Sequence, residues 1–241
     1  MKLLLDFGNT RVKAAVSSDC GLKQIYSGPV VLGGLEHAVC GMEIDGGMWC
    51  SVRNVPDDVM AWMLSLGLTG LDWTTPVPIC NAYRTPRTLG MDRLAAAVGA
   101  WSMQKGHDIL VIDAGTAVTC DFVSADSRFL GGTIAPGVEL RLKALHEHTG
   151  ALPLVGRQGD MPVFGYDTET SIRSGVVNGI RREILGTIQE MCQMYPSLLV
   201  FLTGGDANCF DMTGKSNIFA VDNLVLRGLD AIGKYNEVEN E

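Results

Sequence analysis

The sequence lacks a long apolar run, a leader-like N-terminal segment and any cluster of basic residues. No apolar stretch approaches the roughly 18 residues that a membrane span requires, and Lys2 runs directly into LLLD without the apolar core of a signal peptide. The formal net charge is −8, and sequence-independent nucleic-acid binding needs a basic face. We therefore expect a cytoplasmic protein that binds neither membranes nor nucleic acid.

Closely spaced cysteines and clustered histidines are also missing. The seven cysteines are odd in number and scattered, with no C-x-x-C pair, which is typical of a reducing compartment. We expect most of them to be small buried apolar residues. His146 and His148 stand two residues apart on a predicted helix and would not share a face, so the sequence predicts no zinc site.

What remains is the composition of a folded protein with a large interior. The chain has 241 residues, of which 46% are hydrophobic and 19% are charged. This length can form one domain or two of roughly 100–120 residues.

The stretch LLLDFGNTRVK at 3–13 is the first motif. Its pattern predicts a buried strand that ends near Asp6, a tight turn at Gly8 to Thr10, and a returning strand. A carboxylate at the end of a buried strand is costly unless a cation or a donor meets it, and a hydrated magnesium ion carrying a nucleotide phosphate would do so. A plain hairpin, in which Asp6 accepts from the turn amides, is the alternative.

A second copy of this motif favours the nucleotide interpretation. LVIDAGTAVTCDFV at 110–123 places Asp113 where the first copy has Asp6 and Gly115 where it has Gly8. The repeat predicts two halves, which we expect at 1–105 and 106–241. Starting with the two strands of the first copy, the patterns predict three strands, a helix, a strand and a further helix.

A polar stretch at 81–101 separates the two copies. Its first part is predicted to be a loop and its second part a helix that begins near Asp92. An aspartate there is commonly only a helix cap. With Arg93 beside it, however, the same position offers a proton acceptor next to a guanidinium that can bind a carboxylate.

Three further segments follow in the second half. GGTIAPG at 131–137 predicts a turn whose backbone approaches a ligand at a helix N-terminus, with a purely structural tight turn as the alternative. A long helix is predicted from Thr168 to Tyr195, with an unusually broad apolar face. The strand LLVFLTGGDA at 198–207 ends in a glycine-rich turn that can meet the adenosine or phosphate end of a nucleotide.

Together these segments resemble the type III pantothenate kinases of the acetate and sugar kinase/Hsp70/actin superfamily. The resemblance covers most of the chain, and its motifs occur in order: DFGNTRVK at 6–13, N-x-Y at 81–83, G-x-D-R at 90–93, DAGTAVTCD at 113–121, GGTIAPG at 131–137, Thr168 with SG at 174–175, TGG at 203–205 and DNLVLRGL at 222–229. It implies an α/β fold of two ribonuclease-H-like, actin-like ATPase subdomains with mixed sheets and a central cleft. It also implies ATP-dependent phosphorylation of pantothenate, the first step towards coenzyme A.

The resemblance further implies a role for individual residues. ATP binding falls on Asp6, Phe7, Gly8, Asn9, Thr10, Arg11, Val12, Lys13 and Thr116. Pantothenate binding falls on Tyr83, Gly90, Met91, Asp92, Arg93 and Thr168, with Asp92 as the proton acceptor. Asp6 would organise Mg²⁺, and Asp113 would hold a monovalent cation, K⁺ or NH₄⁺. A homodimer is implied, and we expect the long helix from Thr168 to form its interface.

The chain departs from the family pattern at two places, and two other functions are open to it. Arg227 stands where the family usually has an acidic residue, and the loop at 155–163 fits only loosely. One alternative is another small-molecule kinase or phosphatase of the superfamily, and the other is a regulatory relative without catalysis. The N-x-Y and G-x-D-R stretches argue against the former, and the presence of the motif residues from Asp6 to Thr116 argues against the latter.

Overall fold

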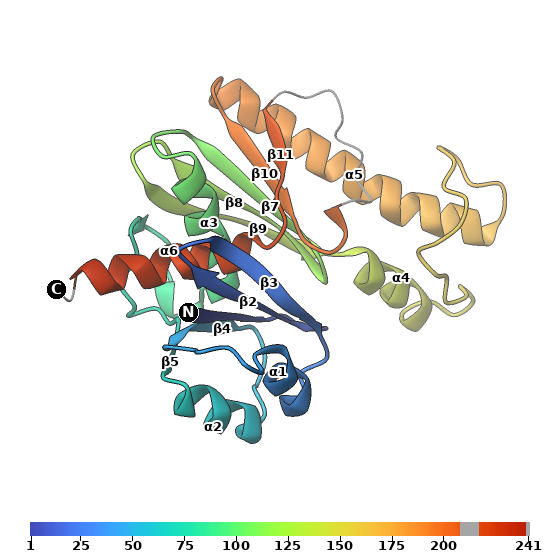
Figure 1. The fold of residues 1–241 in the computed structure, drawn as a ribbon. Coiled ribbons are helices and arrows are strands. Elements are labelled where there is room, and N and C mark those ends of the chain that lie inside the picture. The colour runs from blue at the N-terminus through green and yellow to red at the C-terminus, as the bar shows by residue number, and fades with distance from the viewer. Residues whose placement is uncertain (208–216, 240–241) are drawn as a thin grey trace. The chain divides into compact units, whose positions relative to one another are not determined.

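The computed structural model describes residues 1–207 and 217–239, which form two compact units (Figure 1). Unit 1 comprises Met1–Gly106, Phe122–Gly131 and Asn223–Glu241, and unit 2 comprises His107–Asp121 and Gly132–Asp222. The boundary expected between residues 105 and 106 stays a prediction. None of the helices in the described part of the chain is both long and apolar enough to cross a bilayer.

Unit 1 is built on a mixed five-stranded sheet in the order β3-β2-β1-β4-β5. The strands are β1 (Lys2–Phe7), β2 (Val12–Ser18), β3 (Gly21–Gly28), β4 (Gly47–Ser51) and β5 (Leu68–Gly70). Strand β1 is antiparallel to β2 and parallel to β4. Strands β1 and β2 are the predicted strand and returning strand on either side of the turn. With helices α1 (Leu32–Ala38) and α2 (Asp57–Ser65), the elements follow the predicted order of three strands, a helix, a strand and a helix.

The two faces of this sheet are covered by different helices. Alternate residues of β1, such as Leu5 and Phe7, share a buried cluster with Leu35 of α1 and Met63 of α2. Asp6 has the opposite parity and therefore belongs to the other face. Helix α6 (Leu224–Glu239) contacts β1 and β4, and α3 (Met91–Met103) contacts β4 and packs along α6.

The second sheet has the strand order β11-β10-β7-β8-β9-β6. Its strands are β6 (Cys80–Asn81), β7 (Ile109–Ala114), β8 (Ala117–Ser124), β9 (Arg128–Pro136), β10 (Leu199–Thr203) and β11 (Ile218–Ala220). Strand β10 is parallel to both β7 and β11. The prediction of an α/β fold with two mixed sheets is confirmed, whereas the central cleft stays a prediction.

Helices α4 (Val138–Glu147) and α5 (Thr168–Met194) belong to unit 2. A bidentate ion pair joins them, since Arg141 of α4 donates to both carboxylate oxygens of Glu183 of α5 at 2.7 and 2.6 Å. The broad apolar face predicted for α5 is buried, as shown by Ile172, Val176, Val177, Ile180, Ile184 and Ile188.

Several local predictions are wrong. The segment at 131–137 was expected to be a turn, but β9 continues to Pro136 and only Gly137 caps α4. A side chain at Gly132 would overlap the carbonyl of Cys120, so glycine here allows close strand pairing. The prediction that most cysteines are buried is also wrong, because among the described cysteines Cys20, Cys40 and Cys80 are exposed.

Candidate active site

Asp6 lies near the end of β1, opposite Lys13 on β2 and Cys50 on β4. It is half-buried, and the turn that follows it is open to solvent at Asn9, Thr10 and Arg11. The Arg53 guanidinium donates to the carbonyl oxygen of Asn9 at 3.3 Å, which holds the backbone of this turn. The carboxyl end of β1, the central strand of the sheet, therefore carries a carboxylate beside an accessible turn.

Asp92 is the second residue of α3, and the N-cap position belongs to Gly90. Its Oδ1 accepts the backbone N–H of Arg93 at 2.9 Å. A Cβ atom at Gly90 would lie 2.6 Å from that oxygen, so glycine leaves room for the carboxylate. Asp92 thus satisfies one backbone donor of the helix start, as a cap would, and is only half-buried.

Arg93 and Tyr83 form the other part of this region. The Arg93 side chain is buried, with 7% of the residue exposed, and its guanidinium carbon lies 5.7 Å from the centroid of the Tyr83 ring. Asn81 accepts the backbone N–H of Tyr83 at 3.1 Å. The N-x-Y and G-x-D-R segments are therefore in contact through the Arg93 guanidinium and the Tyr83 ring.

The thiol of Cys50 lies beside Asp6. It is fully buried and its Sγ lies 3.9 Å from Oδ1 of Asp6. Burial raises the pKa of the Cys50 thiol well above its ordinary value, and the negative charges of Asp6 and Asp92 add to that rise. Asp6 and Asp92 thus act on the same buried group. Sequence reasoning missed Cys50 as a neighbour of Asp6, because that placement depends on strand register.

In unit 2, Asp113 lies near the end of β7 and is followed by the turn that holds Gly115 and Thr116. The N–H of Gly137, at the start of α4, donates to the carbonyl oxygen of Thr116 at 2.9 Å. A Cβ atom at Gly137 would overlap the carbonyl oxygen of Gly115. The second turn therefore packs closely on the N-terminus of α4, whereas the approach of this backbone to a ligand stays a prediction.

The glycine-rich turn after β10 also reaches Asp113. Gly204 has a φ of +101°, and a Cβ atom there would lie 2.5 Å from Oδ1 of Asp113. In the described residues, no group of three His, Cys, Asp or Glu side chains could hold a metal by itself. Magnesium is commonly held by one or two carboxylates together with substrate phosphates. In each unit, one carboxylate beside a glycine-containing turn offers oxygen donors of that kind: Asp6 in unit 1 and Asp113 in unit 2.

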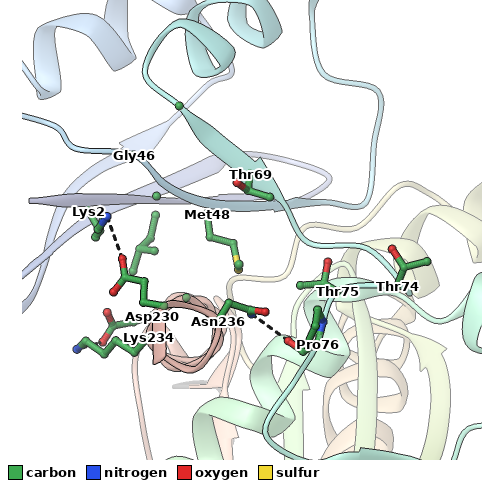
Figure 2. A pocket seen from close by; sticks show the side chains of 15 residues that line it. Lys2, Gly46, Met48, Thr69, Thr74, Thr75, Pro76, Asp230, Lys234 and Asn236 are labelled. Carbon is green, nitrogen blue, oxygen red and sulfur yellow. Dashed lines mark hydrogen bonds and ion pairs between the residues drawn. The ribbon is translucent and has the colours of Figure 1, made fainter. Parts of the chain in front are cut away.

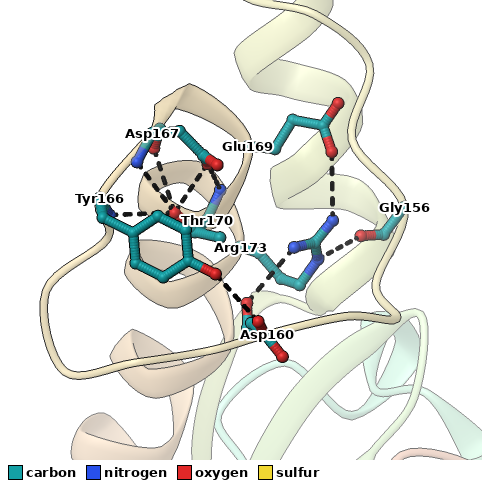
Figure 3. A network of polar contacts seen from close by, with 7 residues as sticks. All are labelled: Gly156, Asp160, Tyr166, Asp167, Glu169, Thr170 and Arg173. Atoms are coloured by element: carbon teal, nitrogen blue, oxygen red, sulfur yellow. Dashed lines mark hydrogen bonds and ion pairs between the residues drawn. The ribbon is translucent and has the colours of Figure 1, made fainter.

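Thr168 is the first residue of α5 and is exposed. A capping box precedes it, in which Asp167 accepts the backbone N–H of Thr170 at 2.8 Å. This hydrogen bond is the main reason why the pKa of Asp167 is lowered. Figure 3 shows the surrounding network, in which Arg173 points towards Gly156 and Asp160 and the Tyr166 hydroxyl donates to Asp160 at 2.9 Å.

The predicted site residues are therefore divided between the units. Asp6 with its turn, Tyr83 and residues 90–93 belong to unit 1, whereas Asp113, Thr116 and Thr168 belong to unit 2. Within unit 1 the structure brings Asp6 to the Cys50 thiol, and it brings Arg93 to Tyr83. Within unit 2 it brings Asp113 to the turn at Gly204.

A cavity of about 840 Å³ in unit 1 does not contain any of these residues (Figure 2). It lies beside α6, and its lining includes Met48, Thr69 and Asn236. Its charged groups are paired: Lys2 with Glu237 at 2.9 Å, and Lys234 with Asp230 at 2.8 Å.

Comparison with known proteins agrees with the motif pattern. The family model described as type III pantothenate kinase matches residues 42–190. The chain is 47% identical over 240 residues to a type III pantothenate kinase of Bacteroides fragilis, covering 98% of both chains. It is 43% identical over 240 residues to one of Phocaeicola vulgatus, covering 98% of this chain and 99% of the relative.

Solved structures at lower identity share the fold. A conserved Baf family transcriptional activator from Campylobacter jejuni matches with a TM-score of 0.63 at 21% identity, covering 98% of this chain and 99% of that one. A 2-dehydro-3-deoxygalactonokinase protein from Sinorhizobium meliloti matches with a TM-score of 0.57 at 13% identity, over 98% and 99% of the two chains. With near-complete relatives at more than 40% identity, the chain belongs to the type III pantothenate kinase family.

Proposed function

We propose that this protein transfers the γ-phosphoryl group of ATP to the primary hydroxyl of pantothenate and forms 4'-phosphopantothenate. Family membership supports this reaction, which begins coenzyme A biosynthesis. The observation that carries it at the level of residues is the start of α3, where Asp92 precedes a buried Arg93 that lies over Tyr83.

Asp92 and Arg93 take complementary roles in this proposal. Arg93 binds the pantothenate carboxylate, because a guanidinium pairs with a carboxylate through two parallel hydrogen bonds. That contact orients the hydroxyl towards Asp92, which accepts its proton. Phosphoryl transfer depends mainly on positioning and charge neutralisation, so the acceptor need take the proton only as the new bond forms. Tyr83, Gly90, Met91 and Thr168 complete the binding of pantothenate.

The nucleotide is assigned to the two turns. Residues 6–13 bind its phosphates, with Asp6 organising Mg²⁺, and Thr116 contacts ATP. Magnesium bound there supplies positive charge to the phosphate oxygens. Asp113 holds a monovalent cation, K⁺ or NH₄⁺, which adds charge where the transferred group is negative. The boundary between residues 105 and 106 and a cytoplasmic location belong to the same proposal.

The experiment is coupled ADP release by the purified protein with Mg²⁺ and ATP, with and without pantothenate, in potassium and in sodium buffer. We expect turnover that requires pantothenate and is faster in potassium. Equal rates in both salts would contradict only the assignment of a monovalent cation to Asp113, and the kinase reaction would stand. No turnover with pantothenate in either salt would reject the kinase, and a panel of sugars and small acids would then separate another kinase from a regulatory relative.

We also propose a homodimer that uses α5 and the loop directly before it. That loop carries large exposed apolar side chains: Val163 is 70% exposed, Phe164 88% and Tyr166 70%. Exposed apolar groups gathered in one place are typical of an interface. A dimer would also place a second copy of the chain near Thr168.

Replacing Phe164 by Asp should convert the dimer to a monomer, because a charge would then have to be buried in an apolar interface. Light scattering after size exclusion at micromolar protein should change from twice the 25.9 kDa chain mass to one chain mass. Val31→Asp is the matched control, since Val31 is 55% exposed in unit 1, and it should remain a dimer. A monomeric wild type, or a dimeric Phe164→Asp, would contradict the proposed interface.

A further inference from the structure

An ion pair joins the loop before α5 to the glycine-rich turn after β10. Arg157 donates from Nη1 to Oδ1 of Asp206 at 2.6 Å. The Asp206 side chain is 12% exposed and that of Arg157 is 40% exposed. A carboxylate as buried as this is costly without a cation or donors, so Arg157 compensates much of the cost of placing Asp206 there.

Asp206 belongs to the backbone that packs on the second turn. Its N–H donates to the carbonyl oxygen of Ala114 at 2.9 Å. Two residues earlier, Gly204 is so close that a side chain there would overlap the same carbonyl and approach Asp113. The position of residues 204–206 therefore determines the shape of the surface beside Asp113.

The backbone that carries Arg157 is itself held from the other side. Arg173 of α5 donates from Nε to the carbonyl oxygen of Gly156 at 3.0 Å and from Nη1 to that of Asp160 at 3.3 Å (Figure 3). Arg173 is buried, with 7% of the residue exposed. Because residues 156 and 160 are both anchored, the Arg157 guanidinium is directed to Asp206 at a reduced entropic cost.

We propose that Arg157 is a positioning residue for the nucleotide, which it serves by holding the 204–206 turn against the Asp113 turn through its ion pair with Asp206. This rests on the proposed function, in which both turns belong to the ATP site. The ion pair lies in unit 2, with the Asp113 turn, whereas Asp92 and Arg93 at the start of α3 belong to unit 1. Its loss should therefore weaken ATP binding much more than pantothenate binding.

The test measures ATP binding by calorimetry without pantothenate, alongside the KM values for ATP and pantothenate. We expect Arg157→Ala and Asp206→Asn each to raise the Kd and KM for ATP about 5- to 20-fold, since either change removes the pairing of the Arg157 guanidinium with the buried Asp206 carboxylate. The KM for pantothenate should stay within about twofold. The double variant should be no weaker than the worse single variant, because both remove the same interaction. Arg157→Lys, which keeps the charge, should recover part of the affinity.

Arg182→Ala is the matched control, because it removes the same charge from an exposed position of α5 in the same unit, and its Kd for ATP should be unchanged. An unchanged Kd in Arg157→Ala would overturn the inference. So would a parallel rise of both KM values with a lower melting temperature, which indicates a general structural role. If the wild type binds ATP but does not phosphorylate pantothenate, the proposed function fails while the binding test of Arg157 stands. A wild type that binds no ATP overturns both.

Discussion

Asp92→Asn should lower kcat by about 10²- to 10⁴-fold, the usual contribution of a positioned general base. Asparagine keeps the shape of the side chain, and its Oδ1 can still accept the N–H of Arg93, which lies 2.9 Å from Asp92 Oδ1. What it cannot do is take the proton of the substrate hydroxyl. The KM for pantothenate should change only a few-fold, because Arg93 still binds the carboxylate. Coupled ADP release gives both constants.

Asp58→Asn separates this chemical effect from the loss of a helix-capping charge. Asp58 occupies the same place in α2 as Asp92 does in α3, and its Oδ1 accepts the N–H of the following residue, Val59, at 2.8 Å. It is exposed, and its replacement should leave kcat unchanged. If Asp92→Asn retained more than about a tenth of kcat, the loss would be smaller than the smallest contribution expected of a general base. Asp92 would then be only a helix cap.

Gly228→Ala should destabilise the fold by about 3 kcal/mol, at the upper end of the cost of inserting a methyl group into a packed core. Gly228 lies on α6, and a Cβ atom there would overlap the carbonyl oxygen of Ala95 on α3. The neighbouring atoms are backbone, which cannot move aside as a flexible side chain can. For a chain of this size the melting temperature should fall by about 6–12 °C. Thermal unfolding followed by circular dichroism measures the change.

Gly233→Ala on the same helix is the matched control. A Cβ atom at Gly233 meets nothing within 4 Å, so the substitution should stabilise the helix by about 0.5–1 kcal/mol through helix propensity. The two variants add the same methyl group to the same helix with opposite expected signs. A melting temperature that rises in both would mean that α3 and α6 are not packed as closely as the structure has them.

The local elements of the site could be predicted from the sequence. The strands that end near Asp6 and Asp113, and the helices that begin near Asp92 and Thr168, all follow from short-range periodicity and turn residues. The segment at 131–137 shows the limit of this reasoning. Its glycines were interpreted as a turn, but close pairing with β8 makes them part of β9. Glycine permits both conformations, so the neighbouring strand decides between them.

The sequence by itself thus determined the family, the repeated strand-turn unit and the identity of the predicted catalytic and binding residues. The tertiary structure alone decided which side chains meet. Cys50 lies beside Asp6 because β4 pairs with β1 in one register, although 44 residues separate them. Arg157 reaches Asp206 across 49 residues. Contacts of this kind depend on how distant segments pack, and local periodicity carries no information about that packing.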